Sequence, residues 1–178
     1  GINTIWANSK IKLELGIEID ANTIVWFKYG TYVVNQATPT LAPTGKLVNI
    51  ECGDKFSIFE GALGTLENTY EIPVGTDILS CVRDILLYTK GNGTVLDNQE
   101  CIMHSSFIGR KTQATITKSA GETFGSLLLE LATQLSAEVF YNTNGNLTFV
   151  PTADTIQDTD KPVLYNFVDN DGDFDGLD

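Results

Sequence analysis

The sequence predicts an α+β fold in which strands dominate, with a small barrel or sandwich-like sheet region and two helices packed on the sheets. Residues 10–20 alternate between apolar side chains and charged or small ones, which is the period of a strand with one buried face. Residues 76–89 and 121–137 each carry apolar side chains at helical spacing. Apolar runs on both sides of Asn144-Gly145 supply the third observation, because this dipeptide favours a tight hairpin turn.

Composition limits the possible functions. The chain has 178 residues, of which 42% are hydrophobic and 19% are charged, and its net charge is −12. This apolar content supports a folded core in one ordinary domain or in two small ones. An acidic surface repels phosphate groups, so we expect no direct nucleic-acid binding and no anionic membrane partner. No apolar run approaches the ~20 residues that span a bilayer.

We expect three regions along the chain. Residues 1–60 form a mainly β region, residues 61–151 an α+β region with two helices and a C-terminal hairpin, and residues 152–178 an acidic extension. The start, Gly1-Ile2-Asn3-Thr4, has no initiator Met and lacks the basic and apolar segments of a signal peptide. We therefore expect a fragment with a processed start and a truncated acidic end.

Further strands are predicted after the first one, over residues 24–52. Residues 24–35 are rich in β-branched and aromatic side chains around one glycine, which predicts either a hairpin or one bulged strand. Residues 38–45 are predicted as a loop, because two prolines remove backbone donors. Residues 46–52 form a further strand, and residues 55–66 are either a short helix or irregular structure.

Both predicted helices follow a glycine and a short polar start. In the first, Thr76 is the expected N-cap and Asp77 lies in the first turn, where the helix dipole favours an acid. Gly91-Asn92-Gly93 stops this helix. The second helix begins either with a capping box of Ser119 and Glu122 or with Thr123 as its N-cap. We interpret both apolar stripes as core faces.

The remaining strands are short. Residues 101–107 and 113–118 each contain a possible strand. The hairpin pairs residues 138–141 with residues 147–150 and turns at Asn142 to Asn146, and Pro151 ends its second strand.

The acidic end contains half of a calcium-binding loop. Asp171, Asp173, Asp175 and Gly176 match the opening of an EF-hand, where carboxylates and a tight turn surround the ion. The loop lacks its twelfth-position Glu, and the segment before it does not resemble an entering helix. We interpret the motif as a solvated acidic turn, although its calcium binding stays open.

The cysteines and the single histidine give no convincing metal site. Cys52, Cys81 and Cys101 are too few and too uneven for a disulfide framework, so a reducing compartment fits best. Cys81 lies in the apolar stripe of the first helix and is expected in the core. Cys101 and His104 are spaced as two zinc ligands, but no second pair completes a tetrahedral set.

No set of residues supports catalysis. His104 is the only imidazole, and no serine lies in a Gly-x-Ser-x-Gly elbow. Gly61-Ala62-Leu63-Gly64 lacks the lysine of a phosphate-binding loop. With 23 acidic residues, carboxylate pairs carry no information, and we expect solvated positions for Glu60, Glu67, Glu71 and Glu100. We therefore expect no enzyme, no cofactor and no metal ion.

A cluster of aromatic residues supports an alternative function. Trp6, Trp26, Tyr29 and Tyr32 lie close together in sequence and could form a platform for sugars. In strands, such residues more often pack in the core or across neighbouring strands. A carbohydrate- or cell-surface-binding β-rich module is therefore kept as the alternative function.

The order of the motifs resembles a known family. A strand over Leu47–Phe56 precedes Pro73-Val74-Gly75-Thr76-Asp77-Ile78 and its helix; Gly121-Glu122-Thr123-Phe124 and its helix follow; Gly145–Pro151 comes last. This order is similar to the tail and baseplate hub proteins of bacteriophages, prophages and related contractile injection machines. The resemblance covers roughly residues 24 to 151.

This resemblance implies a structural role in a virion tail that assembles in the host cytoplasm. Members of that family form symmetric rings around the tail axis, join the tail tube to the spike and surround the DNA channel. The expected partners are other tail or baseplate proteins and copies of the chain itself. The expected function is protein–protein assembly without catalysis.

Overall fold

A computed structural model describes residues 9–42, 45–91, 93 and 95–152 of the chain. Strands and helices both contribute, so the predicted α+β class is confirmed. The elements are β1 (Lys10–Asp20), β2 (Thr23–Ala42), β3 (Gly45–Asp54), α1 (Ser57–Glu60), β4 (Tyr70–Ile72), α2 (Ile78–Leu86), β5 (Cys101–Met103), the 3-10 helix η1 (Ser105–Phe107), β6 (Ile116–Lys118), α3 (Phe124–Leu135), β7 (Ala137–Tyr141) and β8 (Leu147–Pro151).

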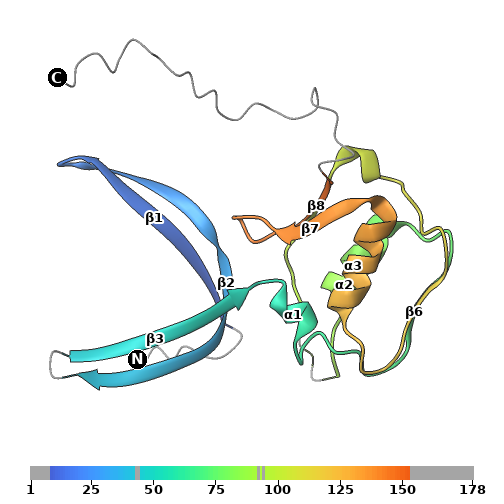
Figure 1. Cartoon of the computed structure of the whole chain (residues 1–178), viewed down its shortest axis with the longest axis horizontal. Coiled ribbons are helices and arrows are strands. Elements are labelled where there is room, and N and C mark those ends of the chain that lie inside the picture. Colours follow the sequence, from blue (N-terminus) through green and yellow to red (C-terminus); the bar gives the residue numbers. More distant parts are fainter. Residues whose placement is uncertain (1–8, 43–44, 92, 94, 153–178) are drawn as a thin grey trace, which may run out of the picture.

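The strands form three open sheets. Their orders are β1-β2-β3, β4-β6 and β5-β8-β7, so no barrel closes in the described part of the chain. Figure 1 shows β1, β2 and β3 as a long, curved sheet that projects away from the helices. We call this sheet (residues 10–54) the ribbon and the rest of the described chain (residues 55–152) the body.

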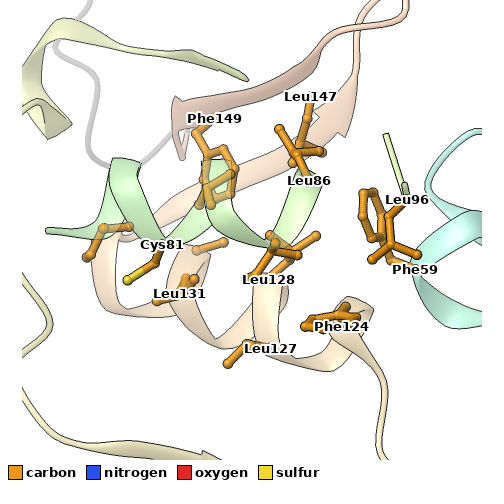
Figure 2. Packing of buried hydrophobic residues seen from close by; sticks show 14 of the residues in the cluster. Phe59, Cys81, Leu86, Leu96, Phe124, Leu127, Leu128, Leu131, Leu147 and Phe149 are labelled. Atoms are coloured by element: carbon orange, nitrogen blue, oxygen red, sulfur yellow. The ribbon is translucent and has the colours of Figure 1, made fainter. Parts of the chain in front are cut away.

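The body holds the hydrophobic core. α2 buries Ile78, Cys81, Val82, Ile85 and Leu86, and this confirms the predicted core stripe and the core position of Cys81. α3 buries its own stripe, which includes Phe124, Leu127, Leu128 and Leu131. Figure 2 shows side chains of α2, α3 and β8 pointing toward one another in this core. Each fully buried side chain of this size contributes about 1.5–3 kcal/mol.

A strand, a glycine turn and a helix occur twice in the body. β4 leads through Gly75 (φ 82°) to α2, and β6 leads through Gly121 (φ 91°) to α3. Each glycine lies two residues before the N-cap, at a backbone angle that favours glycine. β4 and β6 pair antiparallel, so the two units meet at their first strands. The parallel between the two glycine-led helices is therefore structural.

The first helix is shorter than predicted, and its cap is different. The N-cap is Asp77, whose side chain accepts a hydrogen bond from the Ser80 backbone N–H at 2.8 Å, whereas Thr76 was expected there. The helix ends at Leu86 rather than at residue 89. The Leu86 carbonyl accepts from the Asp97 N–H at 2.8 Å, so the returning chain satisfies this helix end.

At the second helix, one of the two proposed caps is confirmed. Thr123 is the N-cap and accepts from the Ser126 N–H at 3.2 Å. The Glu122 carboxylate accepts from the Ser119 N–H at 2.6 Å, so the other proposed pair does interact, one residue before the cap. The hairpin β7–β8 also matches its prediction, with Gly145 at φ 83° in the turn.

β2 is the bulged continuous strand of the two alternatives, and it is longer than expected. It runs through Pro39 to Ala42, where the sequence predicted a loop over residues 38–45. β1 pairs with β2 only as far as Val33, so beyond it one side of β2 lacks a described partner strand. An edge strand tolerates a proline, because one row of its backbone donors faces outward.

Candidate assembly surface

The ribbon has one apolar face along both of its arms. β1 pairs with the first half of β2, and β3 pairs with the second half, so each arm is two strands wide. Directly opposite residues of an antiparallel pair share a face. Following the register through the two bulges of β2 places one set on a single face: Leu13, Leu15, Ile17, Val25, Phe27, Ala37, Pro39, Val48 and Ile50. We call this set the apolar face of the ribbon.

The described chain leaves this face largely uncovered. The larger side chains on it range in exposure from 38% for Ile50 to 55% for Leu15. The alternation over residues 10–20 predicted a buried face, and the structure contradicts that prediction within the described residues. The apolar side is present as predicted. Val34, at the junction of the two arms, lies on this face and is fully buried, but the apolar side chains along the arms are left exposed.

The opposite face of the first arm turns toward the body. Lys28 donates to Asn144 Oδ1 at 2.8 Å, in the turn of the β7–β8 hairpin. Thr31 and Val33 are buried beside that hairpin and the core. The ribbon thus contacts the body through the part of this face that carries Lys28, Thr31 and Val33. Ile24 and Trp26, farther along the same face, are 52% and 62% exposed.

The aromatic residues of the ribbon are more exposed than core residues would be. Trp26 and Tyr29 are each 62% exposed, so the expectation that they lie in the core is wrong. Trp26 lies across Gly16 of β1, where an added Cβ would approach the indole Cζ3 to 2.9 Å. Cross-strand packing of Trp26 is therefore confirmed. Trp6 lies outside the described residues.

A buried ion pair joins the ribbon to the body. Lys55 follows β3 directly, and its Nζ lies 2.7 Å from Asp97 Oδ2, with both side chains essentially inaccessible. Lys10 of β1 binds Asp97 Oδ1 at 2.8 Å, and the Tyr141 hydroxyl donates to Asp97 Oδ2 at 2.7 Å. Lys55 also donates to the Gly145 carbonyl at 2.7 Å. One carboxylate thereby holds the start of β1, the end of β3 and the β7–β8 hairpin together.

The charges in this cluster support one another. Burial disfavours the ionised Asp97, but hydrogen bonds from Lys10, Lys55 and Tyr141 outweigh it and hold its pKa below the ordinary value. Burial lowers the pKa of Lys55, and the Asp97 carboxylate opposes that shift. Burial and the same carboxylate raise the pKa of Tyr141, so this hydroxyl stays a hydrogen-bond donor. Sequence patterns gave no sign of this cluster, because its members are far apart along the chain.

Cys101 and His104, whose spacing allows two zinc ligands, gain no third ligand among the described residues. His104 Nδ1 lies 2.8 Å from the Ser106 hydroxyl at the start of η1. Among the described residues, no three His, Cys, Asp or Glu side chains gather around a common point. Asp171, Asp173, Asp175 and Gly176 lie outside the described residues, so their interpretation as a solvated acidic turn stays a prediction.

A surface hollow lies beside α2, and the Cys101 thiol in its lining is not an activated nucleophile. It has a volume of about 450 Å³, and its lining includes Arg83, Glu100 and Cys101. Burial raises the pKa of the Cys101 thiol to about 11, so the group is protonated at neutral pH. The solvated positions expected for Glu60, Glu67, Glu71 and Glu100 are confirmed, since all four are exposed.

None of the helices that the structure describes is long and apolar enough to cross a membrane. No protein-family model matches the sequence, and no curated protein matches it. Among solved structures, the 43 kDa tail protein of prophage MuSo2 from Shewanella oneidensis is similar at 18% identity with a TM-score of 0.48. The match covers 82% of this chain and 45% of that protein, so the chain spans less than half of its length. A similarity at this level assigns neither fold nor function.

Proposed function

We propose that the chain is a structural component of a phage or prophage tail or baseplate. It acts by protein–protein assembly around the tail axis and not by catalysis. Its partners are other tail or baseplate proteins and copies of itself. The ribbon is the assembly element, and the body is the folded base that holds it.

One observation carries this proposal: the apolar face of the ribbon is patterned for burial but exposed. Leu13, Leu15 and Ile17 alternate with charged or small residues over one strand, yet about half of each side chain is open. Covering such a side chain fully is worth about 1.5–3 kcal/mol. Contiguous exposed apolar surface of this kind is typical of protein interaction sites.

The shape of the ribbon favours an assembly role as well. Each arm is a two-stranded hairpin, and an isolated hairpin of this kind is marginally stable in water. A partner that covers the apolar face stabilises the arm and gains binding energy at the same time. The tail assignment itself comes from the motif order over residues 24 to 151, which resembles the tail and baseplate hub proteins.

Electron microscopy of the parent particle with a tag on this chain tests the proposal. We expect label on the tail; label elsewhere, or none on the particle, would contradict it. A Leu15→Asp variant should fold but fail to enter particles, because it places a charge in the apolar face. Leu129→Asp is the matched control, since Leu129 is 47% exposed on α3, away from the ribbon, and this variant should enter normally.

The exposure of the aromatic residues keeps the alternative function testable. Trp26 and Tyr29 are open enough to stack against a sugar ring. A carbohydrate- or cell-surface-binding module predicts binding on a glycan array that Trp26→Ala abolishes. Absence of binding by the unmodified chain removes the reason for this alternative.

A further inference from the structure

The outer edge of β1 has no partner strand in the described part of the chain. The sheet order β1-β2-β3 places β1 at the edge, and its only described pairing is with β2. We propose that this edge pairs with β1 of a second copy, antiparallel and two-fold symmetric, with Leu15 opposite Leu15. The contact would join two ribbons into one sheet.

β1 is regular enough to act as a template. The irregularity between Leu13 and Glu14 inserts Tyr29 on the β2 side, so β1 itself alternates without interruption from Lys10 to Glu18. An exposed row of backbone N–H and C=O groups invites pairing with another chain. Opposite residues share a face, so pairing must place apolar residues of one copy opposite apolar residues of the other.

The charges on β1 select the register. With the two Leu15 residues at the centre, Lys12 of each copy lies opposite Glu18 of the other. Glu14 of each copy likewise lies opposite Gly16 of the other. Opposite charges at directly paired positions stabilise a sheet, and like charges destabilise it. All of these charged side chains are exposed. The pattern is self-complementary, as a two-fold interface requires.

The neighbouring registers are worse. In a register centred on Glu14, the Glu14 carboxylates of the two copies lie opposite each other. In a register centred on Gly16, Glu14 of each copy lies opposite Glu18 of the other. Centring on Leu13 pairs Lys12 with Glu14 but overlaps β1 only over residues 10–16. The Leu15 register pairs β1 over its whole length, and no like charges lie opposite each other over residues 12–18. Lys10 does not contribute to the choice of register, because its ammonium group is already bound to Asp97.

This inference does not depend on the tail assignment. Pairing through the edge of β1 uses backbone groups and the opposite charges of Lys12 and Glu18, and it leaves the apolar faces of both ribbons on the same side of the joined sheet. Those faces stay available to the partners proposed above. Leu15→Asp would disturb both contacts, because Leu15 lies on the apolar face and at the centre of the proposed pair. Lys12→Glu and Glu18→Lys change the edge pairing and leave the apolar face unaltered, so these variants distinguish loss of self-association from loss of tail incorporation.

Sedimentation of the 178-residue chain over a range of concentrations tests the contact. We expect a reversible dimer. Lys12→Glu alone or Glu18→Lys alone should weaken association about tenfold, because each places like charges opposite one another twice. The double variant Lys12→Glu/Glu18→Lys restores the opposite pairs and should dimerise like the unmodified chain. A monomer at all concentrations, or a double variant no tighter than the single ones, overturns the proposal.

Disulfide cross-linking tests the register. In a Cys52→Ser background, which removes the exposed native thiol, Leu15→Cys should form a cross-linked dimer on mild oxidation. Directly opposite residues of an antiparallel pair have Cα atoms about 4.5–5.5 Å apart, within the range of a disulfide. Ile17→Cys is the control, because a distance of about 13 Å along the strand separates the substituted position from the same position in the second copy. Equal cross-linking of both variants, or of neither, contradicts the register.

Discussion

The ribbon and the body carry similar apolar patterns and use them differently. In the body, α2 and α3 cover each other and β8, so Phe124, Leu128 and Phe149 are fully buried. In the ribbon, Leu15, Ile17 and Phe27 are about half exposed. Periodicity shows which side of an element is apolar. Whether that side becomes a core or a contact surface depends on what the rest of the chain places against it.

The largest difference should appear when one aromatic side chain is removed from each part. Phe124→Ala should destabilise the chain by about 3–5 kcal/mol, because Phe124 is fully buried against Tyr70 and Tyr88. Phe27→Ala in the ribbon should cost less than about 1 kcal/mol, since half of that ring is already solvated. Urea unfolding measures both. Equal losses would mean that the ribbon is covered in solution.

Removing the charge of Asp97 should loosen the connection between the two parts. Asp97→Asn leaves Lys55 as an uncompensated buried charge, with an expected loss of about 3 kcal/mol. Asp84→Asn is the matched control, because it removes the same charge from an exposed position on α2. The unfolding free energy should change by less than about 0.5 kcal/mol in that control.

The same carboxylate makes stability depend on acid. The folded pKa of Asp97 is lowered, so its stabilisation is complete above the unfolded value of about 4 and is lost as the pH falls through the lower, folded pKa. Urea unfolding between pH 7 and pH 2 should therefore show a steeper acid loss for the unmodified chain than for Asp97→Asn. Parallel pH curves would contradict an ionised, bonded Asp97.

The contact between the hairpin turn and β2 can be tested with two glycines. Gly145→Ala should cost about 2 kcal/mol, because its backbone has φ 83° and the new Cβ would approach Thr31 Oγ1 to 2.8 Å. Gly121→Ala should cost only about 1 kcal/mol, since its φ is 91° but nothing lies within 4 Å of the added carbon. A larger loss at Gly121 in thermal unfolding would show that the turn is not seated on the ribbon.

The smallest effect on stability is expected on the apolar face itself. Leu15→Asp should change the unfolding free energy by less than about 0.5 kcal/mol, because the side chain is already 55% exposed. The same variant should lose assembly. A strong destabilisation of the isolated chain in urea would indicate that another part of the same chain covers this face.

Local patterns were sufficient for most elements of the fold. The alternation over Lys10–Asp20, the stripes of α2 and α3 and the Asn144-Gly145 turn each follow from short-range spacing. The loop predicted around Pro39 was wrong. β2 can include this proline because β1 pairs with β2 only as far as Val33, which leaves one side of the strand without a described partner strand at Pro39. That information lies in the tertiary pairing.

The candidate surface was only partly predictable. The sequence predicted the apolar side of β1 but placed it against a core, because spacing cannot show which element covers a face. The Lys55–Asp97 pair was not predicted, since 42 positions separate two residues that occupy ordinary turn sequences. Such a cluster exists only after β1, β3 and β7 meet.

Hydrogen–deuterium exchange of the isolated chain and of assembled particles tests the central claim most directly. We expect strong protection of α2, α3 and β8 in both samples, because their core is complete within the chain. The ribbon, residues 10–54, should exchange faster in the isolated chain and become protected in the particle. A ribbon that is as protected as α3 in the isolated chain, or one that gains no protection on assembly, would contradict the account.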